Sequence, residues 1–489
     1  MALLHSFWYD EALKAFTEIT VTDPNCAMAY WGIAMSLYYP LWQPPDTTAL
    51  KKGLAAIEHA KRLGAKTSRE QAYIEAIETF YKNFETLDHR TRALAYEKAM
   101  EQISRRYPED PEAAIFYGLA LNGTALPTDK TYSNQKAAGE ILAKVFTEQP
   151  DHPGIAHYII HSYDSPPLAS RALPAARRYA KIAPSSPHAL HMPSHIFIRL
   201  GLWPESIESN RASAVAAKEH VTRTRPGAAS FDELHAIDYL MYAYLQGAQD
   251  REAKRLLDAL NAMERVDVEN FAAAYAFAAV PARWTLERRR WSEAATLTLH
   301  PSSFPWNRFP WTEAIVYFAR ALGATRSGDL ARAQTDVAKL QSLHQALVDT
   351  KQAYWADQVE ILRRAAAAWL AHAKSQHAEA LTLMRSAADL EDATEKHPVT
   401  PGAIVPAREL LGDLLLELNE PKQALREFET SLTASPNRLN GLYGAARAAE
   451  LIGETQKARH YYTQLMTNCD RADNEIPALQ QAKTFLTKK

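Results

Sequence analysis

The sequence predicts an all-α protein, a solenoid in which pairs of helices repeat along the chain. Glycine is scarce, 17 of 489 residues, while alanine-rich amphipathic stretches occur throughout. No strand-like alternation and no Gly/Ser linker interrupts them. Residues of the same type also recur at a fixed interval, which is typical of repeat architectures. We expect one continuous solenoid of roughly nine to eleven helix pairs over residues 1–489.

The clearest repeat lies near the end of the chain. Gly412 and Ala424 recur as Ala446 and Ala458, one repeat of about 34 residues further on. Residues 435–466 read as one helix–turn–helix unit with Gly453 in the turn. Small residues at equivalent places allow two helices to approach closely, so these positions predict the contacts within and between pairs.

Similar units are predicted elsewhere. Residues 25–39 and 111–123 each read as the first helix of a pair, and residues 51–107 as three or more helices. The stretch Trp8–Pro24 reads as the second half of a repeat whose first helix is cut short. Two alternatives remain open: a removed leader, which would place the protein in the periplasm or outside the cell, and a cytoplasmic protein with a frayed first helix.

Composition excludes several functions. The net charge is −2, so nothing predicts a nucleic-acid partner, and no apolar run is long enough to span a bilayer. The two cysteines, Cys26 and Cys469, cannot form a disulfide framework. The common nucleotide, serine-hydrolase and zinc-protease motifs are absent from the sequence.

The chain resembles the tetratricopeptide-repeat superfamily over nearly its whole length, because a spacing of about 34 residues is the period of that repeat. It is most similar to a bacterial subset with strings such as HPGIAHYIIHSYD (152–164) and PHALHMPSHIFIRLGLWPESIESN (187–210). The strings DELHAIDYLMYAYLQ (232–246) and EKHPVTPGAIVPARELLGDLL (395–415) belong to the same resemblance. It implies a right-handed α-solenoid and a possible peptide or protein partner, but no particular reaction.

One histidine motif occurs twice in the sequence, and the two copies are separated by this repeat period. His157 and His161 form one His-x-x-x-His pair, and His191 and His195 form another, one repeat period further on. Residues four apart lie on one face of a helix, where two imidazoles can bind one metal ion. The sequence therefore predicts a site within residues 152–246.

The histidines do not belong to the apolar stripe that packs helix on helix. Around the first pair, that stripe falls on Ala156, Ile159, Ile160 and Tyr163, and the histidines are interleaved with it. The resemblance implies that such positions line the concave groove of the solenoid. We therefore expect the histidine side chains to face this groove.

A third repeat extends the pattern. His235, Asp238 and Tyr242 take the places that His188, His191 and His195 take one repeat earlier. We therefore add His188, His235 and Asp238 to the predicted ligands. His5 and His397 could join them only through long-range folding.

Imidazole-dominated ligation predicts copper, zinc or iron. Tyr158, Tyr239 and Tyr242 are candidate acid–base groups or hydrogen-bond partners of the ligands. The first hypothesis is a metal-dependent enzyme that performs oxidation or hydrolysis. The alternatives are a scaffold that holds a peptide or small molecule in the concave groove without catalysis, and metal carriage or sensing.

Overall fold

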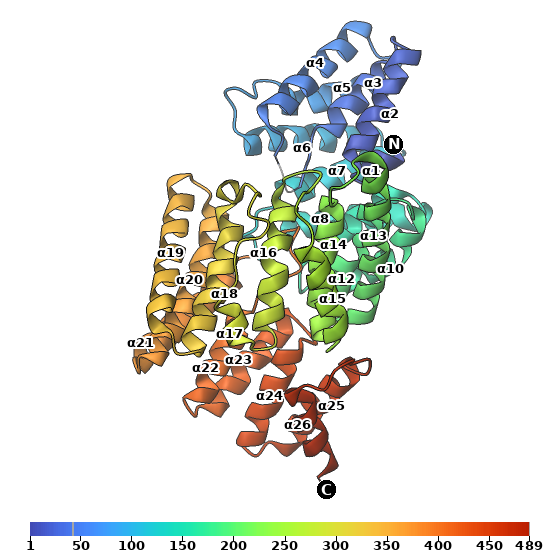
Figure 1. The fold of residues 1–489 in the computed structure, drawn as a ribbon. Coiled ribbons are helices and arrows are strands. Elements are labelled where there is room, and N and C mark those ends of the chain that lie inside the picture. Colours follow the sequence, from blue (N-terminus) through green and yellow to red (C-terminus); the bar gives the residue numbers. More distant parts are fainter. Residues whose placement is uncertain (42–43, 489) are drawn as a thin grey trace. The chain divides into compact units, whose positions relative to one another are not determined.

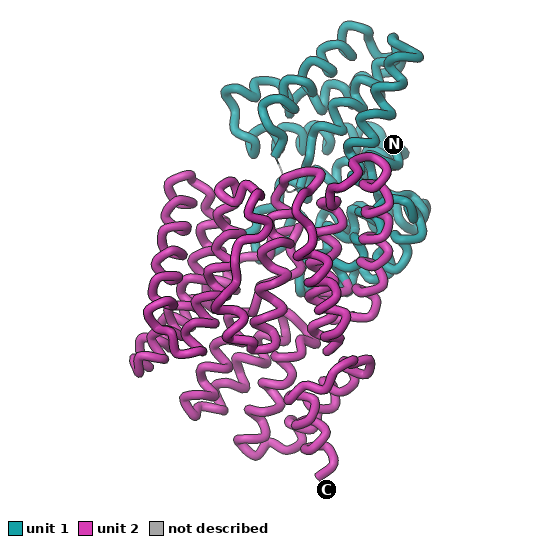
Figure 2. Tube along the Cα trace, in the orientation of Figure 1, with its two compact units in different colours: residues 1–196 teal, residues 197–489 magenta. Residues whose placement is uncertain are grey.

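The described part of the protein, residues 1–41 and 44–488 of a computed structural model, consists of helices and connecting turns and contains no strand (Figure 1). The all-α prediction is confirmed. The chain divides into two compact units, Met1–Ile196 and Phe197–Lys489, which are described separately (Figure 2). One continuous solenoid over residues 1–489 therefore stays a prediction.

Unit 1 contains the helices α1 (Ala2–His5), α2 (Tyr9–Thr22), α3 (Ala27–Ser36), α4 (Thr47–Leu63), α5 (Ser68–Tyr81), α6 (His89–Arg106), α7 (Pro111–Thr124), α8 (Ser133–Glu148), α9 (Pro153–Tyr163), α10 (Ala169–Ile182) and α11 (Pro187–His191). The short α12 (Pro193–Arg199) spans the division. Consecutive helices from α2 onward pack against each other as expected for a helical repeat.

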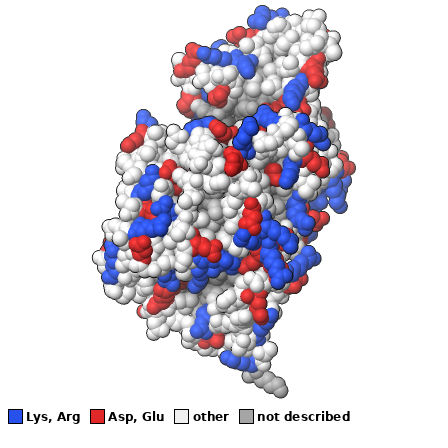
Figure 3. Space-filling view, viewed as in Figure 1, with Lys and Arg blue, Asp and Glu red and all other residues white. Residues whose placement is uncertain are grey.

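Unit 2 contains α13 (Trp203–Thr224), α14 (Phe231–Gln246), α15 (Asp250–Asn261), α16 (Phe271–Leu286), α17 (Trp291–Ala294), the 3₁₀ turn η1 (Trp306–Arg308), α18 (Pro310–Arg326), α19 (Leu330–Asp349), α20 (Ala353–Ala373), α21 (His377–Ala393), α22 (Ala407–Glu417), α23 (Pro421–Ala434), α24 (Leu439–Leu451), α25 (Thr455–Asn468) and α26 (Pro477–Thr487). No described helix is both long and apolar enough to cross a membrane. Acidic and basic side chains lie interspersed on the face shown in Figure 3.

Local sequence signals explain where many helices begin. The side chains of Asp46, Asp88 and Ser186 cap α4, α6 and α11 by accepting hydrogen bonds from backbone N–H groups of the first turn. Thr67 and Glu70 form a reciprocal capping box at the start of α5. These caps satisfy donors that have no partner inside the helix.

The predicted repeat at the end of the chain is observed as α22 to α25. α23 begins at Pro421 and α25 at Thr455, so the second helices of the two pairs are separated by the predicted repeat period. A Cβ added at Gly412 of α22 would lie 2.7 Å from Cζ of Phe428 on α23. The ring therefore fills the space that the missing side chain leaves, which is the close approach that the sequence predicts.

Unit 2 also makes contacts between helices far apart in the sequence. α14 lies against α24, where Arg438 donates to the hydroxyl of Tyr242 at 2.8 Å. The same guanidinium pairs with Glu287 at 2.7 Å and Glu409 at 2.6 Å, and all three charged side chains are buried. A buried cation requires such compensation, so this network holds the repeats of unit 2 together.

The insertion before α22 fills part of the interior of unit 2. Arg283 of α16 is fully buried and donates to the carbonyl oxygens of Gly402 and Ala403 at 2.9 and 2.6 Å. Because these carbonyls belong to a loop, the guanidinium supplies hydrogen-bond donors that helical neighbours would otherwise provide.

Gly412→Leu tests the repeat contact. The added side chain would overlap the Phe428 ring, so we expect a loss of roughly 1–3 kcal/mol in the free energy of unfolding of unit 2. Ala378→Leu, at an exposed position of α21, is the matched control and is expected to change stability by less than about 0.5 kcal/mol. Calorimetric unfolding measures both variants, and equal effects would contradict the close packing.

Candidate metal centre

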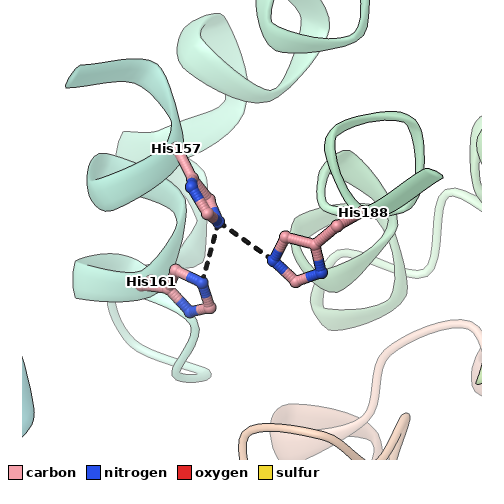
Figure 4. Close-up of side chains that lie close together, drawn as sticks. All are labelled: His157, His161 and His188. Atoms are coloured by element: carbon pink, nitrogen blue, oxygen red, sulfur yellow. Dashed lines mark hydrogen bonds between the residues drawn. The ribbon is translucent and has the colours of Figure 1, made fainter. Parts of the chain in front are cut away.

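Three imidazoles meet between α9 and α11 in unit 1. His157 and His161 lie one turn apart on α9, and His188 extends from α11 toward them (Figure 4). The Nε2 atom of His157 is 3.1 Å from Nε2 of His161 and 3.1 Å from Nε2 of His188. The three histidines offer ligand atoms that all lie within 4.8 Å of one another. We call His157, His161 and His188 the three-histidine cluster.

The tautomer of His157 is determined by its other ring nitrogen. Nδ1 lies 2.6 Å from the backbone carbonyl oxygen of His5, which can only accept, so Nδ1 carries the proton. Nε2 of the neutral ring then presents one lone pair. Both His161 and His188 point a nitrogen at this single lone pair, and one lone pair cannot accept two strong hydrogen bonds.

Aromatic rings enclose His157, whose side chain is fully buried. Phe7 contacts it edge-on with ring centroids 4.4 Å apart, and Tyr179 stacks on it at 5.1 Å. Burial, helped by the charges of neighbouring imidazoles, holds the pKa values of His157 and His188 well below the ordinary value of 6.5. Both rings are therefore neutral at physiological pH, and each has one ring nitrogen with a lone pair.

A second pair of imidazoles lies on the next segment. Pro193 has no N–H group to continue the helix, so the single predicted helix is divided into α11, which ends at His191, and α12, which carries His195. Their Nε2 atoms are still only 3.0 Å apart. Nδ1 of His195 lies 3.0 Å from a carboxylate oxygen of Asp164, an arrangement that orients metal-binding histidines in many proteins.

The spacing of the three-histidine cluster suits a metal ion. Metal–nitrogen bonds of about 2.0–2.1 Å place two imidazole nitrogens of one ion roughly 3.3–3.5 Å apart. The two measured separations of 3.1 Å are within a few tenths of an ångström of this value. Small side-chain rotations would therefore bring Nε2 of His157 and of either neighbour to bonding distance from one ion, and the third separation is below 4.8 Å.

His5, Glu112 and His152 form another group of similar composition, but their hydrogen bonds oppose metal binding. The backbone N–H of Gly154 donates to Nδ1 of His152, so Nε2 of this neutral ring carries the proton and faces Glu112 at 3.3 Å. Nε2 of His5 lies 3.0 Å from the same carboxylate. Although burial alone raises it, these hydrogen bonds hold the pKa of Glu112 well below its usual range. The group is therefore best described as a carboxylate with two imidazole donors.

The predicted tyrosine Tyr158 belongs to this second group. Its hydroxyl lies 3.1 Å from Nδ1 of His5, and the side chain is fully buried. Burial raises the pKa of this phenol well above its ordinary value. Tyr158 therefore contacts the cluster through His5, whose carbonyl accepts from His157, and its ring also lies 5.3 Å from that of His157.

The remaining predicted residues lie on α14 of unit 2 and are described with that unit alone. Asp238 is paired with Arg283 at 3.3 Å, and Tyr242 accepts a hydrogen bond from Arg438. His235 and Tyr239 contact each other edge-on at 5.3 Å. The part that these four residues play in a metal site stays a prediction.

His397, the other long-range candidate, is part of an aromatic cluster in unit 2. Its ring stacks on Trp355 with centroids 4.9 Å apart. Burial and the charge of Lys396 lower its pKa to about 3, so the ring is neutral.

The sequence alone does not identify Phe7, Tyr179, Asp164 or the carbonyl of His5 as parts of the site. The sequence does point to Asp164, because this residue ends the string 152–164 that carries the first histidine pair. It gives no such signal for Phe7 and the His5 carbonyl, because they are remote from the cluster in the sequence and only tertiary folding brings them close.

Comparison with known proteins adds little about function. No family model and no curated protein matches the sequence. Solved helical structures with similarity include a human IFIT1 dimer with m7Gppp-AAAA (12% identity, 92% of this chain and 90% of that chain, TM-score 0.37) and yeast Tom70 (11% identity, 98% and 92%, TM-score 0.37). Such low TM-scores support no conclusion about ligands, so the predicted absence of a nucleic-acid partner stays a prediction, as does membership of the bacterial subset.

Asp238→Asn tests the buried ion pair of α14. Burial raises the pKa of Asp238 to about 6 against the opposing effect of Arg283, so the folded protein binds this proton more tightly than the unfolded chain. The free energy of unfolding of unit 2 should therefore fall by on the order of 2–3 kcal/mol as pH rises from about 4 to about 7. The asparagine variant should lack this contribution, and calorimetry of both proteins across this range measures the difference in slope. Parallel profiles would show that the carboxylate is not destabilised by burial.

Glu112→Gln separates the carboxylate group from a metal site. Losing the charge weakens two imidazole hydrogen bonds, so we expect unit 1 to lose about 1–2 kcal/mol of stability. The number of metal ions bound per chain should not change, because neither imidazole presents a lone pair to this carboxylate. A fall in metal stoichiometry with unchanged stability would instead make Glu112 a ligand.

Proposed function

We propose that the chain is a transition-metal-binding helical-repeat protein whose ion is held by His157, His161 and His188. One observation carries this proposal. Two imidazole nitrogens point at the only lone pair of His157, and a positive ion among the three nitrogens could be bound by a lone pair from each ring at once. Without an ion, His157 can accept only one strong hydrogen bond from its two imidazole neighbours.

The surroundings support metal binding further. The hydrogen bond from Nδ1 of His157 to the His5 carbonyl has the form that fixes ring orientation and increases ligand basicity in metalloproteins. Imidazole donors suit copper, zinc and iron better than calcium or magnesium. Catalysis, either oxidation or hydrolysis, would also need a coordination position for substrate or water, and it stays a prediction.

The alternative is a scaffold that binds a peptide or small molecule in a concave groove. A groove ligand must touch exposed side chains, yet His157 is fully buried beneath Phe7 and Tyr179. Burial therefore disfavours His157 as a peptide contact, although it leaves other surfaces of the helical repeat available to a protein partner.

His157→Ala tests the centre directly. The full chain, purified without a polyhistidine tag and stripped with chelator, is loaded with Zn(II) or copper and dialysed before elemental analysis. We expect about one ion at the three-histidine cluster of the unaltered protein and an affinity at least about 100-fold weaker in the variant. Less than about a tenth of an equivalent in the unaltered protein would refute the proposal.

Two controls accompany this measurement. His460→Ala removes an exposed histidine of α25 and should leave the metal content unchanged. The double variant His157→Ala/His195→Ala tests the wider set of predicted ligands. A loss beyond that of His157→Ala would assign the His191/His195 pair to metal binding, whereas an equal loss would remove His195 from the ligands.

A further inference from the structure

We infer that the three-histidine cluster is built for cuprous copper, Cu(I), held by three imidazoles beneath the ring of Phe7. The inference rests on the proposed metal centre and adds the identity and coordination number of the ion. It follows from the charge of the three imidazole donors, from the Phe7 ring that lies beside them, and from the backbone turn that positions this ring.

The charge of the donor set favours a monovalent ion. The three ligand atoms are nitrogens of imidazoles, which are neutral ligands, and His157 is completely buried. The cost of removing an ion from water grows with the square of its charge, so a divalent ion here costs about four times as much desolvation as a monovalent one. Zinc sites with three histidines offset this cost with a water or hydroxide at a fourth position.

Phe7 occupies space beside all three imidazoles. Its ring centroid lies 4.4 Å from that of His157, 5.6 Å from that of His161 and 5.8 Å from that of His188. It stacks on the latter two rings at angles of 25° and 24°, and its side chain is only 8% exposed. A hydrocarbon ring thus covers this side of the cluster, where a fourth ligand would need a polar atom. Copper(I) is stable with three ligands, whereas Zn(II) prefers four.

The backbone holds the ring in this place. The N–H of Phe7 donates to the carbonyl of Leu4 and that of Trp8 to the carbonyl of Leu3, which is the hydrogen-bond pattern that ends many helices. Phe7 itself has a φ of 54°, a conformation that favours glycine. The turn that ends α1 therefore places the ring of Phe7 beside the imidazoles.

The same turn also supplies the His5 carbonyl that accepts from Nδ1 of His157. One short segment, residues 5–7, thus orients one ligand and covers all three. These two contacts orient His157 and place a hydrocarbon ring beside all three donors, of which His161 and His188 are partly exposed.

The test measures coordination and preference in the full chain with an untagged N-terminus. Copper is loaded without oxygen in the presence of ascorbate, and X-ray absorption counts the atoms bound to it. Affinities are obtained by competition with bathocuproine disulfonate for Cu(I) and with a chromophoric chelator for Zn(II). We expect three nitrogen neighbours for Cu(I) in the unaltered protein.

Phe7→Ala should admit a fourth light atom and raise the affinity for Zn(II) relative to Cu(I) by at least about tenfold. The matched control is Phe16→Ala on α2, because Phe16 packs against Gly32 and its removal should not alter this ratio. Circular dichroism checks the fold of both variants. If Phe7→Ala does not fold, the coordination number in the unaltered protein still decides.

The possible outcomes separate the two proposals. Four-coordinate Cu(I) in the unaltered protein, or an unchanged ratio in a folded Phe7→Ala variant, would overturn the inference and leave the metal centre standing. Failure to bind either ion, with the same result in His157→Ala, would refute the metal centre itself. Three-coordinate Cu(I) that is lost in His157→Ala would support both.

Discussion

The hydrogen bond from Nδ1 of His157 to the carbonyl oxygen of His5 determines what the surrounding imidazoles can do. It is 2.6 Å long and buried, and it leaves the ring with one lone pair on Nε2. Because His161 and His188 approach that lone pair together, the cluster directs more nitrogens at one acceptor than hydrogen bonding can use. The geometry of these three residues therefore fits the metal ligands that we propose, even though each lies on an ordinary helix.

Residue composition alone cannot separate such a cluster from a hydrogen-bonded group. Unit 1 contains both kinds within a short stretch of chain, since His152 is the N-cap of α9 and His157 lies on the same helix. His152 caps the helix with Nδ1 and turns a protonated Nε2 toward Glu112. His157 instead donates from Nδ1 to the His5 carbonyl and presents the lone pair of Nε2. The partner of one ring nitrogen decides the role of the other, and only the folded structure shows that partner.

The repeat period predicts the fold class and both histidine pairs, because helical periodicity and repeat spacing are properties of nearby residues. The grouping of the histidines was less predictable. Only the third repeat points to His188 as a ligand, yet His188 completes the cluster with His157 and His161. Pro193 interrupts the predicted helix, so His188 and His195 lie on separate segments.

Long-range contacts set the remaining limit on prediction from sequence. The pairing of Asp238 with Arg283 joins different repeats of unit 2, and nothing in the local pattern of α14 indicates it. The same holds for Phe7, whose apolar character suggests only a core position. These features depend on tertiary packing, which overrides local preference.

The contact between residues 5–7 and α9 has a consequence for the order in which the centre is made. During synthesis residues 5–7 leave the ribosome long before His157, His161 and His188, so the turn that they form can make its contact with α9 only later. Closing so long a loop costs entropy that local helix formation does not recover. The ring of Phe7 covers the imidazoles only once this loop is closed. If the cluster holds an ion as we propose, capture and release of the ion would therefore depend on the closing and opening of this contact.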